Sequence, residues 1–244
     1  MYNLSETQLN DIHNRLLLLL KVFKYICEAE GIWYTLAFGS VLGAVRHNGF
    51  IPWDSDADVV IRLEDVGKFR LAFDKYKPDG INLKNYDIDI RNTKSHDVLY
   101  YERSQPFNDL HLDIYPLVGA PNDLKIQRIV QCRNYFLDRF FRSKYVNVAD
   151  CLETNRRKVL LVKLICKFIP DSFIKSNIKK RELEFDVYTS NYLTCFASPY
   201  MPVPKICWDS IISVSFEDTK FNIPGNWDLY LSSLYGDYLT PKMY

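Results

Sequence analysis

Three aspartates at alternate positions are the chemical feature from which this sequence is best read. Asp54, Asp56 and Asp58 lie in "PWDSDADVVIRL", directly before a β-branched run. Residues two apart in a strand project from one face, about 7 Å apart along the backbone, so Asp56 and Asp58 are expected to share a face. Clustered carboxylates repel one another and resist burial, and a bound cation would offset that repulsion. We therefore predict a metal site formed by Asp56 and Asp58, with Asp54 as a further candidate ligand.

A third carboxylate is expected from the strand-like run "LHLDIYPLV" at residues 110–118. If Leu112 and Ile114 face the core, Asp113 faces the opposite side. Asp113 is thus the best candidate for a third metal ligand or for the base that accepts a proton from an attacking hydroxyl. Hard cations such as Mg²⁺, or Mn²⁺ in its place, prefer oxygen ligands and keep phosphate oxygens in their shell. This pattern indicates phosphoryl-transfer chemistry.

A Gly-Ser turn upstream provides a candidate phosphate site. Gly39 and Ser40 follow the apolar run "WYTLAF", and "SVLGAVRH" is compatible with a short helix that begins at Ser40. The free N–H groups at such a helix start would bind phosphate close to the aspartates. A turn, a helix start and a strand that begins with carboxylates together form the layout of a nucleotidyltransferase-type core.

The composition predicts an ordinary globular protein. The chain has 244 residues, 48% of them hydrophobic, and a formal net charge of +1, so no overall field favours nucleic acid. The six cysteines include no C-x-x-C pair, which favours reduced thiols in a cytosolic protein. Charged residues bracket the apolar run at 16–20, so we expect neither a signal peptide nor a membrane span there.

Periodicity predicts a mixed α/β fold. A capping box at "SETQ" opens a helix expected to end near Gly31, and a strand is expected at 57–63 with a helix at 64–76. Helices are expected from 123 to about 189, interrupted at Pro170, and one more at 227–238. We expect one continuous domain with a catalytic core (1–120), a helical elaboration (121–200) and a C-terminal motif that packs back on the core (201–244).

One segment is strongly basic. Residues 156–181 hold nine Lys or Arg and a single acid, Asp171, interleaved with apolar residues. This pattern is compatible with peripheral contact with anionic lipid headgroups and also with a helical hairpin whose basic face is solvated. The sequence favours the hairpin slightly and leaves both open.

The aspartates lie in a stretch that resembles a known family. "GSVLGAVRHNGFIPWDSDADVVI" is similar to the signature of the LicD family, which includes bacterial phosphocholine transferases and resembles the fukutin group. "LDIYPLVGAPND" and "VSFEDTKFNIPGNWDLYLSSLYGDYLTP" resemble two further blocks of that family, in the same order. The helical middle, about residues 121–200, matches only loosely.

The resemblance implies a nucleotidyltransferase-like fold and metal-dependent transfer of a phospho-alcohol, typically phosphocholine from CDP-choline, to a cell-surface glycan such as lipopolysaccharide, capsule or teichoic acid. It matches Asp56, Asp58 and Asp113 to the metal-binding acids and Gly39 with Ser40 to the phosphate turn. It also matches Arg46 and His47 to basic residues that would stabilise the charge of a diphosphate. Ser55 and Ala57 stand where the family often has Asp and Ile, which removes one nearby negative charge.

Choline carries a quaternary ammonium without a hydrogen-bond donor, so an aromatic face is its natural partner. Trp53, beside the aspartates, is the aromatic candidate. The expected partners are a CDP-alcohol donor and a glycan acceptor, lipid-linked or free. We expect a cytoplasmic protein, with peripheral attachment to the inner face of the plasma membrane left open.

Two other functions use the same residues differently. A nucleotidyltransferase would move an NMP from an NTP to a small molecule or glycan, and a non-catalytic member of the fold would bind glycan alone. The presence of all three acids argues against a pure binding module. The sequence leaves open whether Asp54 or Asp113 is the general base.

Overall fold

The computed structural model describes residues 5–87, 96–102, 110–146, 153–196 and 200–240, with the side chains of 153–156 excepted. The chain forms two compact units. Unit 1 comprises residues 1–84, 97–117 and 203–244, and unit 2 comprises residues 85–96 and 118–202. The division into core, elaboration and C-terminal motif stays a prediction.

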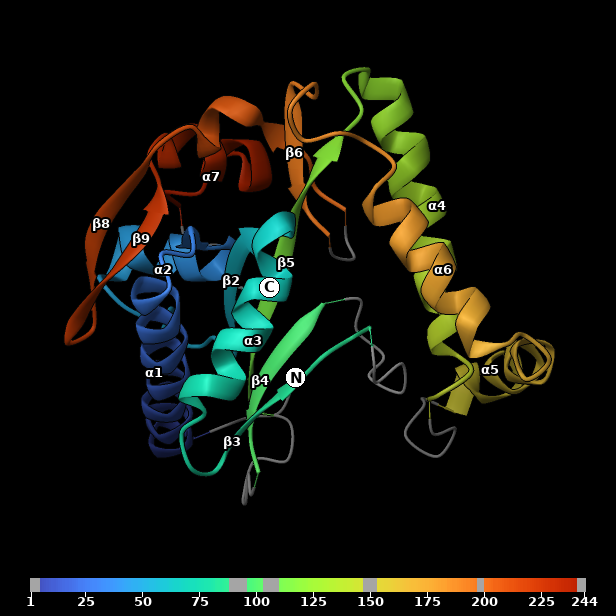
Figure 1. Ribbon diagram of the computed structural model, residues 1–244, viewed down its shortest axis with the longest axis horizontal. Coiled ribbons are helices and arrows are strands. Elements are labelled where there is room, and N and C mark those ends of the chain that lie inside the picture. Colours follow the sequence, from blue (N-terminus) through green and yellow to red (C-terminus); the bar gives the residue numbers. More distant parts are fainter. Residues whose placement is uncertain (1–4, 88–95, 103–109, 147–152, 197–199, 241–244) are drawn as a thin grey trace. The chain divides into compact units, whose positions relative to one another are not determined.

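A mixed sheet forms the centre of unit 1 (Figure 1), in the strand order β1-β2-β5-β4-β3. β1 (Tyr34–Leu36) is antiparallel to β2 (Ala57–Arg62), and β2 is parallel to β5 (His111–Ala120). β4 (Asp97–Tyr101) runs antiparallel to β5, and β3 (Ile81–Lys84) antiparallel to β4. Both β2 and β5 are almost entirely buried, as expected of central strands rich in β-branched and apolar residues. The predicted α/β fold with a mixed sheet is confirmed.

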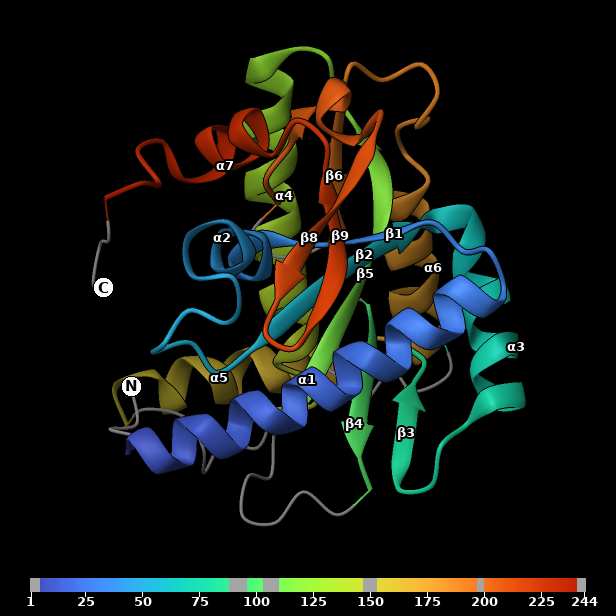
Figure 2. The ribbon, with the colours of Figure 1, turned by 90° about the vertical axis from the view of Figure 1, so that its left-hand side faces the viewer.

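Helix α1 (Glu6–Ala29) lies across one face of this sheet (Figure 2). It begins with the predicted capping box, in which the Gln8 N–H donates to Ser5 Oγ at 3.2 Å and the Ser5 N–H donates to Gln8 Oε1 at 2.8 Å. Its apolar stripe is buried, as the helical spacing predicts: Ile12, Leu16, Leu19, Leu20, Phe23 and Ile26. α3 (Val66–Tyr76) packs beside α1 and follows a 3₁₀ turn, η1 (Leu63–Asp65).

The C-terminal residues of unit 1 return to the part of the chain that carries the aspartates. They form β7 (Val203–Pro204), the 3₁₀ turn η3 (Lys205–Trp208), the hairpin of β8 (Ile211–Phe216) and β9 (Thr219–Pro224), and α7 (Trp227–Tyr235). β9 contacts β1, and α7 contacts α2 (Phe38–His47). The sequence analysis did not predict the β8–β9 hairpin.

Unit 2 contains the helices expected between residues 123 and 189. These are α4 (Leu124–Arg142), α5 (Glu153–Cys166) and α6 (Asp171–Glu182), followed by β6 (Tyr192–Cys195). Pro170 precedes α6 as its N-cap, which explains the predicted interruption. Unit 2 also buries an ion pair, in which Arg181 Nη2 donates to Asp138 Oδ1 at 2.9 Å.

Candidate functional site

The candidate site is built on two neighbouring parallel strands of unit 1. In the register of β2 and β5, Asp58 lies directly opposite Asp113. Residues paired in this way project to the same side of the sheet, and their backbones are about 4.8 Å apart. Each aspartate is only 8% exposed. The structure therefore brings two of the predicted acids together as a buried pair.

Asp113 is surrounded by polar and aromatic groups of its own strand. The Tyr115 hydroxyl donates to Asp113 Oδ2 at 3.3 Å, and His111 Nε2 lies 3.4 Å from Oδ1. Asp113 and Tyr115 thus share one side of β5, as the alternation predicted. The Tyr115 ring also packs edge-on against Phe38, with ring centroids 5.5 Å apart.

Asp54 and Asp56 lie in the loop before β2. Because β2 begins at Ala57, the prediction that Asp56 and Asp58 project from one strand face is wrong for Asp56, which precedes the strand and is exposed. Asp54 Oδ1 accepts a hydrogen bond from the Ser55 N–H at 2.9 Å. Burial, the charge of Asp56 and a hydrogen bond to the Asp56 side chain raise the pKa of Asp54 to about 7. These two carboxylates form a second close pair.

Helix α2 starts earlier than predicted and packs directly on these acids. It begins at Phe38 rather than Ser40, so Gly39 and Ser40 belong to its first turn and not to a separate turn. A Cβ atom on Gly39 would lie 3.0 Å from Asp54 Oδ2, so glycine permits this close approach. The buried Ser40 Oγ accepts a hydrogen bond from the Asp58 N–H at 2.9 Å. Gly39 and Ser40 thus each contact a predicted metal ligand.

The three remaining predicted residues lie at the other end of α2. Arg46 Nη1 donates to the Tyr238 carbonyl at 3.3 Å. His47 meets the half-exposed Trp53 edge to face, with centroids 6.2 Å apart. Burial and the charge of Arg46 lower the pKa of His47. These contacts join His47 to Trp53 and Arg46 to the C-terminal segment, and neither of them involves an aspartate.

Residues that sequence reasoning missed hold the aspartate loop, residues 48–56, in place. His13 Nε2 lies 2.7 Å from the Asp54 carbonyl oxygen, and its ring stacks on Phe50 at 4.6 Å. Glu217, in the β8–β9 turn, accepts from the Phe50 N–H at 2.9 Å and donates its own N–H to the Asn48 carbonyl at 2.7 Å. Glu217 lies in a block that carries the family resemblance, so the sequence could have indicated its importance. Nothing in the sequence indicated a role for His13.

Phe38 is also outside the sequence predictions. Its φ is 44°, in the left-handed region that phenylalanine rarely adopts. The Phe38 N–H donates to the hydroxyl of Tyr230, on α7, at 3.0 Å. Such strain persists only where the surroundings impose it, so α7 helps to fix the start of α2.

Carboxylate oxygens are the ligands that a hard cation prefers, and the strand register places Asp58 and Asp113 next to each other, as a shared ion would require. Over the described parts of the chain, no three His, Cys, Asp or Glu side chains gather closely enough to hold a metal ion. The acids are arranged as two pairs, Asp58 with Asp113 and Asp54 with Asp56.

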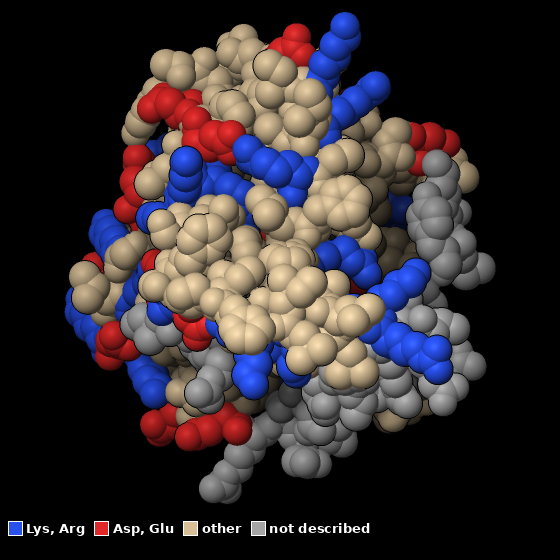
Figure 3. Space-filling view, turned by 90° about the vertical axis from the view of Figure 1, so that its right-hand side faces the viewer, with Lys and Arg blue, Asp and Glu red and all other residues tan. Residues whose placement is uncertain are grey.

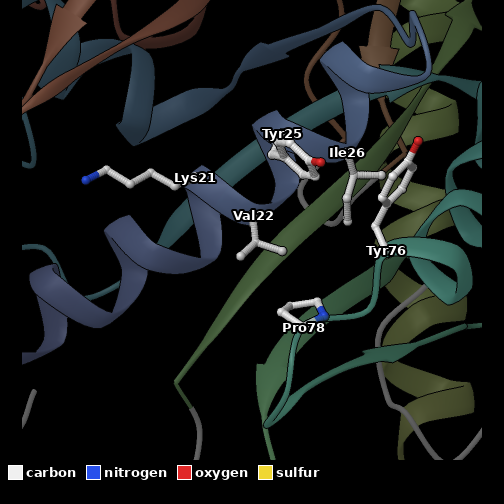
Figure 4. Close-up of a pocket in the computed structure, with 6 residues that line it drawn as sticks. All are labelled: Lys21, Val22, Tyr25, Ile26, Tyr76 and Pro78. Carbon is white, nitrogen blue, oxygen red and sulfur yellow. The ribbon is translucent and has the colours of Figure 1, made fainter.

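A hollow elsewhere in unit 1 is not part of this site. It measures about 270 Å³ and lies between α1 and the end of α3 (Figure 4). Its walls are Lys21, Val22, Tyr25, Ile26, Tyr76 and Pro78, none of them an acid. We assign the chemistry to the aspartates instead.

The mixed sheet and the paired acids are the features that the sequence predicted for a nucleotidyltransferase-type core. Residues 31–147 match the domain family described as "LicD/FKTN/FKRP, nucleotidyltransferase domain". The predicted resemblance to the LicD family is confirmed.

Two relatives indicate the chemistry found in this family. The lipopolysaccharide cholinephosphotransferase LicD of Haemophilus influenzae is 25% identical over 233 residues, which cover 91% of this chain and 87% of that protein. The ribitol 5-phosphate transferase FKRP of Homo sapiens is 57% identical over 42 residues, which cover 17% of this chain and 8% of that protein. Both relatives are named as transferases of a substituted phosphate.

Proposed function

We propose that this protein transfers a phospho-alcohol, with phosphocholine as the first candidate, from a CDP-alcohol to a hydroxyl of a cell-surface glycan or its precursor. The observation that carries the proposal is the in-register pair of buried carboxylates, Asp58 and Asp113, in a chain that matches the LicD domain family. The full-length similarity to a cholinephosphotransferase makes choline the first alcohol to test.

In this reaction a glycan hydroxyl attacks the distal phosphorus of the CDP-alcohol in line. The new acceptor O–P bond forms as the P–O bond to CMP breaks, and the hydroxyl proton passes to a carboxylate. Asp113 and Asp54 are both candidates for that base. Asp54 has a pKa of about 7, which suits proton exchange near neutral pH. At the start of α2 the Phe38 and Ser40 N–H groups already donate to Tyr230 and to the Ala37 carbonyl, so the Gly39 N–H is the group that would contact a phosphate.

The proposed cofactor is Mg²⁺ or Mn²⁺. Asp56, Asp58 and Asp113 would hold it, with Asp54 as a further ligand, and when bound it would supply positive charge to the diphosphate. Ser40 holds the start of β2 through the Asp58 N–H, so it fixes one of these ligands. Arg46 and His47 would add charge stabilisation only if the diphosphate extends to the far end of α2.

An aromatic side chain would bind the quaternary ammonium of choline. Trp53 is 50% exposed and lies within the aspartate loop, next to Asp54, so its ring is accessible to a donor. Phe38 packs on Tyr115 directly beside Asp113 and offers a second aromatic surface. A Trp53→Ala variant that loses preference for CDP-choline over CDP-glycerol would identify Trp53 as the choline contact.

Release of CMP by the purified protein tests the proposal. CDP-choline, CDP-ethanolamine, CDP-glycerol and CDP-ribitol are offered with Mg²⁺, in parallel with NTPs, with and without a lipid-linked or capsular glycan. We expect acceptor-stimulated release of CMP from one CDP-alcohol. Pyrophosphate release from an NTP would instead identify a nucleotidyltransferase, and glycan binding without turnover of any donor would identify a binding protein.

Variants connect the activity to the acids. Asp58→Asn and Asp113→Asn should each abolish turnover, because each removes a charge from the buried pair. Asp218→Asn is the matched control. Asp218 lies in the β8–β9 turn, is exposed and forms an ion pair with Lys21. Wild-type rates in Asp58→Asn and Asp113→Asn would refute the assignment of the site.

A further inference from the structure

Helix α5 of unit 2 carries its apolar side chains outward. Leu160, Leu161, Leu164 and Ile165 recur at helical spacing and are exposed, and Phe168, just past the end of the helix, is 86% exposed. Leu161 alone is 64% exposed. Residues at this spacing form one stripe along a helix. These five side chains are called the α5 outer face.

The opposite side of α5 anchors the helix to unit 2. Cys166 is fully buried and its thiol donates to the Phe140 carbonyl at 3.1 Å. Lys163 Nζ donates to the Val146 carbonyl at 2.8 Å. α5 is thus packed through one side while a second, apolar side points to solvent. A solvated helix would be expected to show the reverse, with polar residues outside.

Positive charge flanks the α5 outer face. Arg157 and Lys158 at its start and Lys167 at its end are exposed, and among the described residues none of them forms an ion pair with an acid. The one acid of this segment, Asp171, is already bound by Lys144 and Tyr145. Figure 3 views the side on which α4, α5 and α6 lie and shows a broad area of uncharged side chains with Lys and Arg, and some Asp and Glu, around it.

We propose that the α5 outer face docks on a membrane that contains anionic lipid. The apolar side chains would enter the boundary between headgroups and acyl chains, and Arg157, Lys158 and Lys167 would contact lipid phosphates. The charge pattern favours lipid over a protein partner, because the exposed charges described on both flanks, Arg157, Lys158 and Lys167, are all basic.

The helix would lie in the plane of the membrane. α5 has 14 residues, which span about 21 Å, less than the roughly 30 Å of a hydrocarbon core. No helix in the described chain is long and apolar enough to cross a bilayer. Docking of this kind would place the enzyme next to a lipid-linked acceptor. Membrane docking goes beyond the proposed reaction, and vesicle binding can be measured without any turnover.

Flotation with vesicles tests the proposal. The full chain is mixed with vesicles of phosphatidylcholine alone or with added phosphatidylglycerol, and the bound fraction is measured. We expect clear binding only with phosphatidylglycerol. Leu161→Glu with Phe168→Glu should weaken it at least tenfold, because two apolar contacts are lost and charge is added. Lys158→Gln and Lys167→Gln should each weaken it about fivefold.

Controls separate docking from general effects on the protein. Leu71→Glu changes an equally exposed leucine on α3, in unit 1, and Lys77→Gln removes an exposed charge there; both should bind as wild type. Thermal unfolding of each variant confirms that it folds. Equal binding to both vesicle types, or unchanged binding of the Leu161/Phe168 variant, would overturn the proposal. The proposal would also be overturned if the wild-type protein does not bind vesicles but is a dimer by light scattering, and the Leu161/Phe168 variant is a monomer.

CMP release from soluble substrates measures turnover independently of vesicle binding. A membrane-defective variant should keep its rate on a soluble acceptor, because none of the residues assigned to the aspartate site lies on α5. Loss of vesicle binding with full turnover would support docking as a separate property. Vesicle binding without any turnover would leave docking intact and refute the reaction instead.

Discussion

Replacement of Gly43 by alanine tests how α2 positions the aspartate loop. A Cβ atom at Gly43 would lie 2.4 Å from the Gly49 carbonyl oxygen and 3.2 Å from the Ile51 nitrogen. Both neighbours are backbone atoms of the loop, so no side chain can rotate away. An ordinary contact starts near 3.4 Å, so the loop must move by about 1 Å.

The expected loss of stability follows from two opposing effects. Overpacking of this kind costs about 1–3 kcal/mol, and the better helix propensity of alanine returns up to about 1 kcal/mol. Gly43→Ala should therefore lower the free energy of unfolding by about 1–2 kcal/mol, measured by urea titration. Gly67→Ala is the matched control: Gly67 lies in α3 with open space around it, so the variant should be as stable as wild type or slightly more stable.

The same shift should impair catalysis more than it impairs folding. A displacement of 1 Å in a catalytic group can cost about 100-fold in rate. We expect a loss of this order in CMP release by Gly43→Ala and none by Gly67→Ala. A Gly43→Ala protein with wild-type stability and rate would show that the loop tolerates displacement and that its close packing on α2 has no role.

Three further results are expected. Glu217→Ala removes the acceptor of the Phe50 N–H, so it should cost about 1 kcal/mol in urea unfolding and reduce turnover, whereas Asp218→Ala in the same turn should do neither. Arg70→Ala removes the ion pair to Asp97, which is 1% exposed and bound by Arg70 at 2.8 and 2.9 Å, and should cost about 3–5 kcal/mol, much of which a second change, Asp97→Leu, should restore. The pKa of His47 is lowered in the folded protein, so the unfolded chain binds the proton more readily. The stability of the fold should therefore fall as the pH drops below about 6.5. In His47→Gln the melting temperature should fall less over that pH range.

Local patterns predicted most of the elements that carry the site. The β-branched run after Asp58 and the apolar alternation around Asp113 predicted β2 and β5, and the two strands proved to be neighbours. The capping box predicted the start of α1 correctly. These features depend on residues close together in the sequence, so local propensity was sufficient.

The parts that were missed depend on contacts between distant residues. Nothing in the local sequence indicates a left-handed phenylalanine, and Phe38 adopts that conformation where Tyr230, 192 residues away, accepts its N–H. α2 therefore begins two residues earlier than its polar residues predicted. The β8–β9 hairpin was missed because several of its apolar residues, such as Ile211 and Ile212, are exposed and the expected alternation is blurred.

The support of the aspartate loop also determines when the site can form during synthesis. Glu217 reaches Phe50 across 167 residues, and Tyr230 reaches Phe38 across 192. When the strand that carries Asp58 leaves the ribosome, neither contact exists, because both partners are still to be translated. A nascent chain would thus expose its acidic cluster before the loop is fixed. Activity should appear late, after the β8–β9 hairpin and α7 have emerged, even though the acids themselves lie in the first half of the chain.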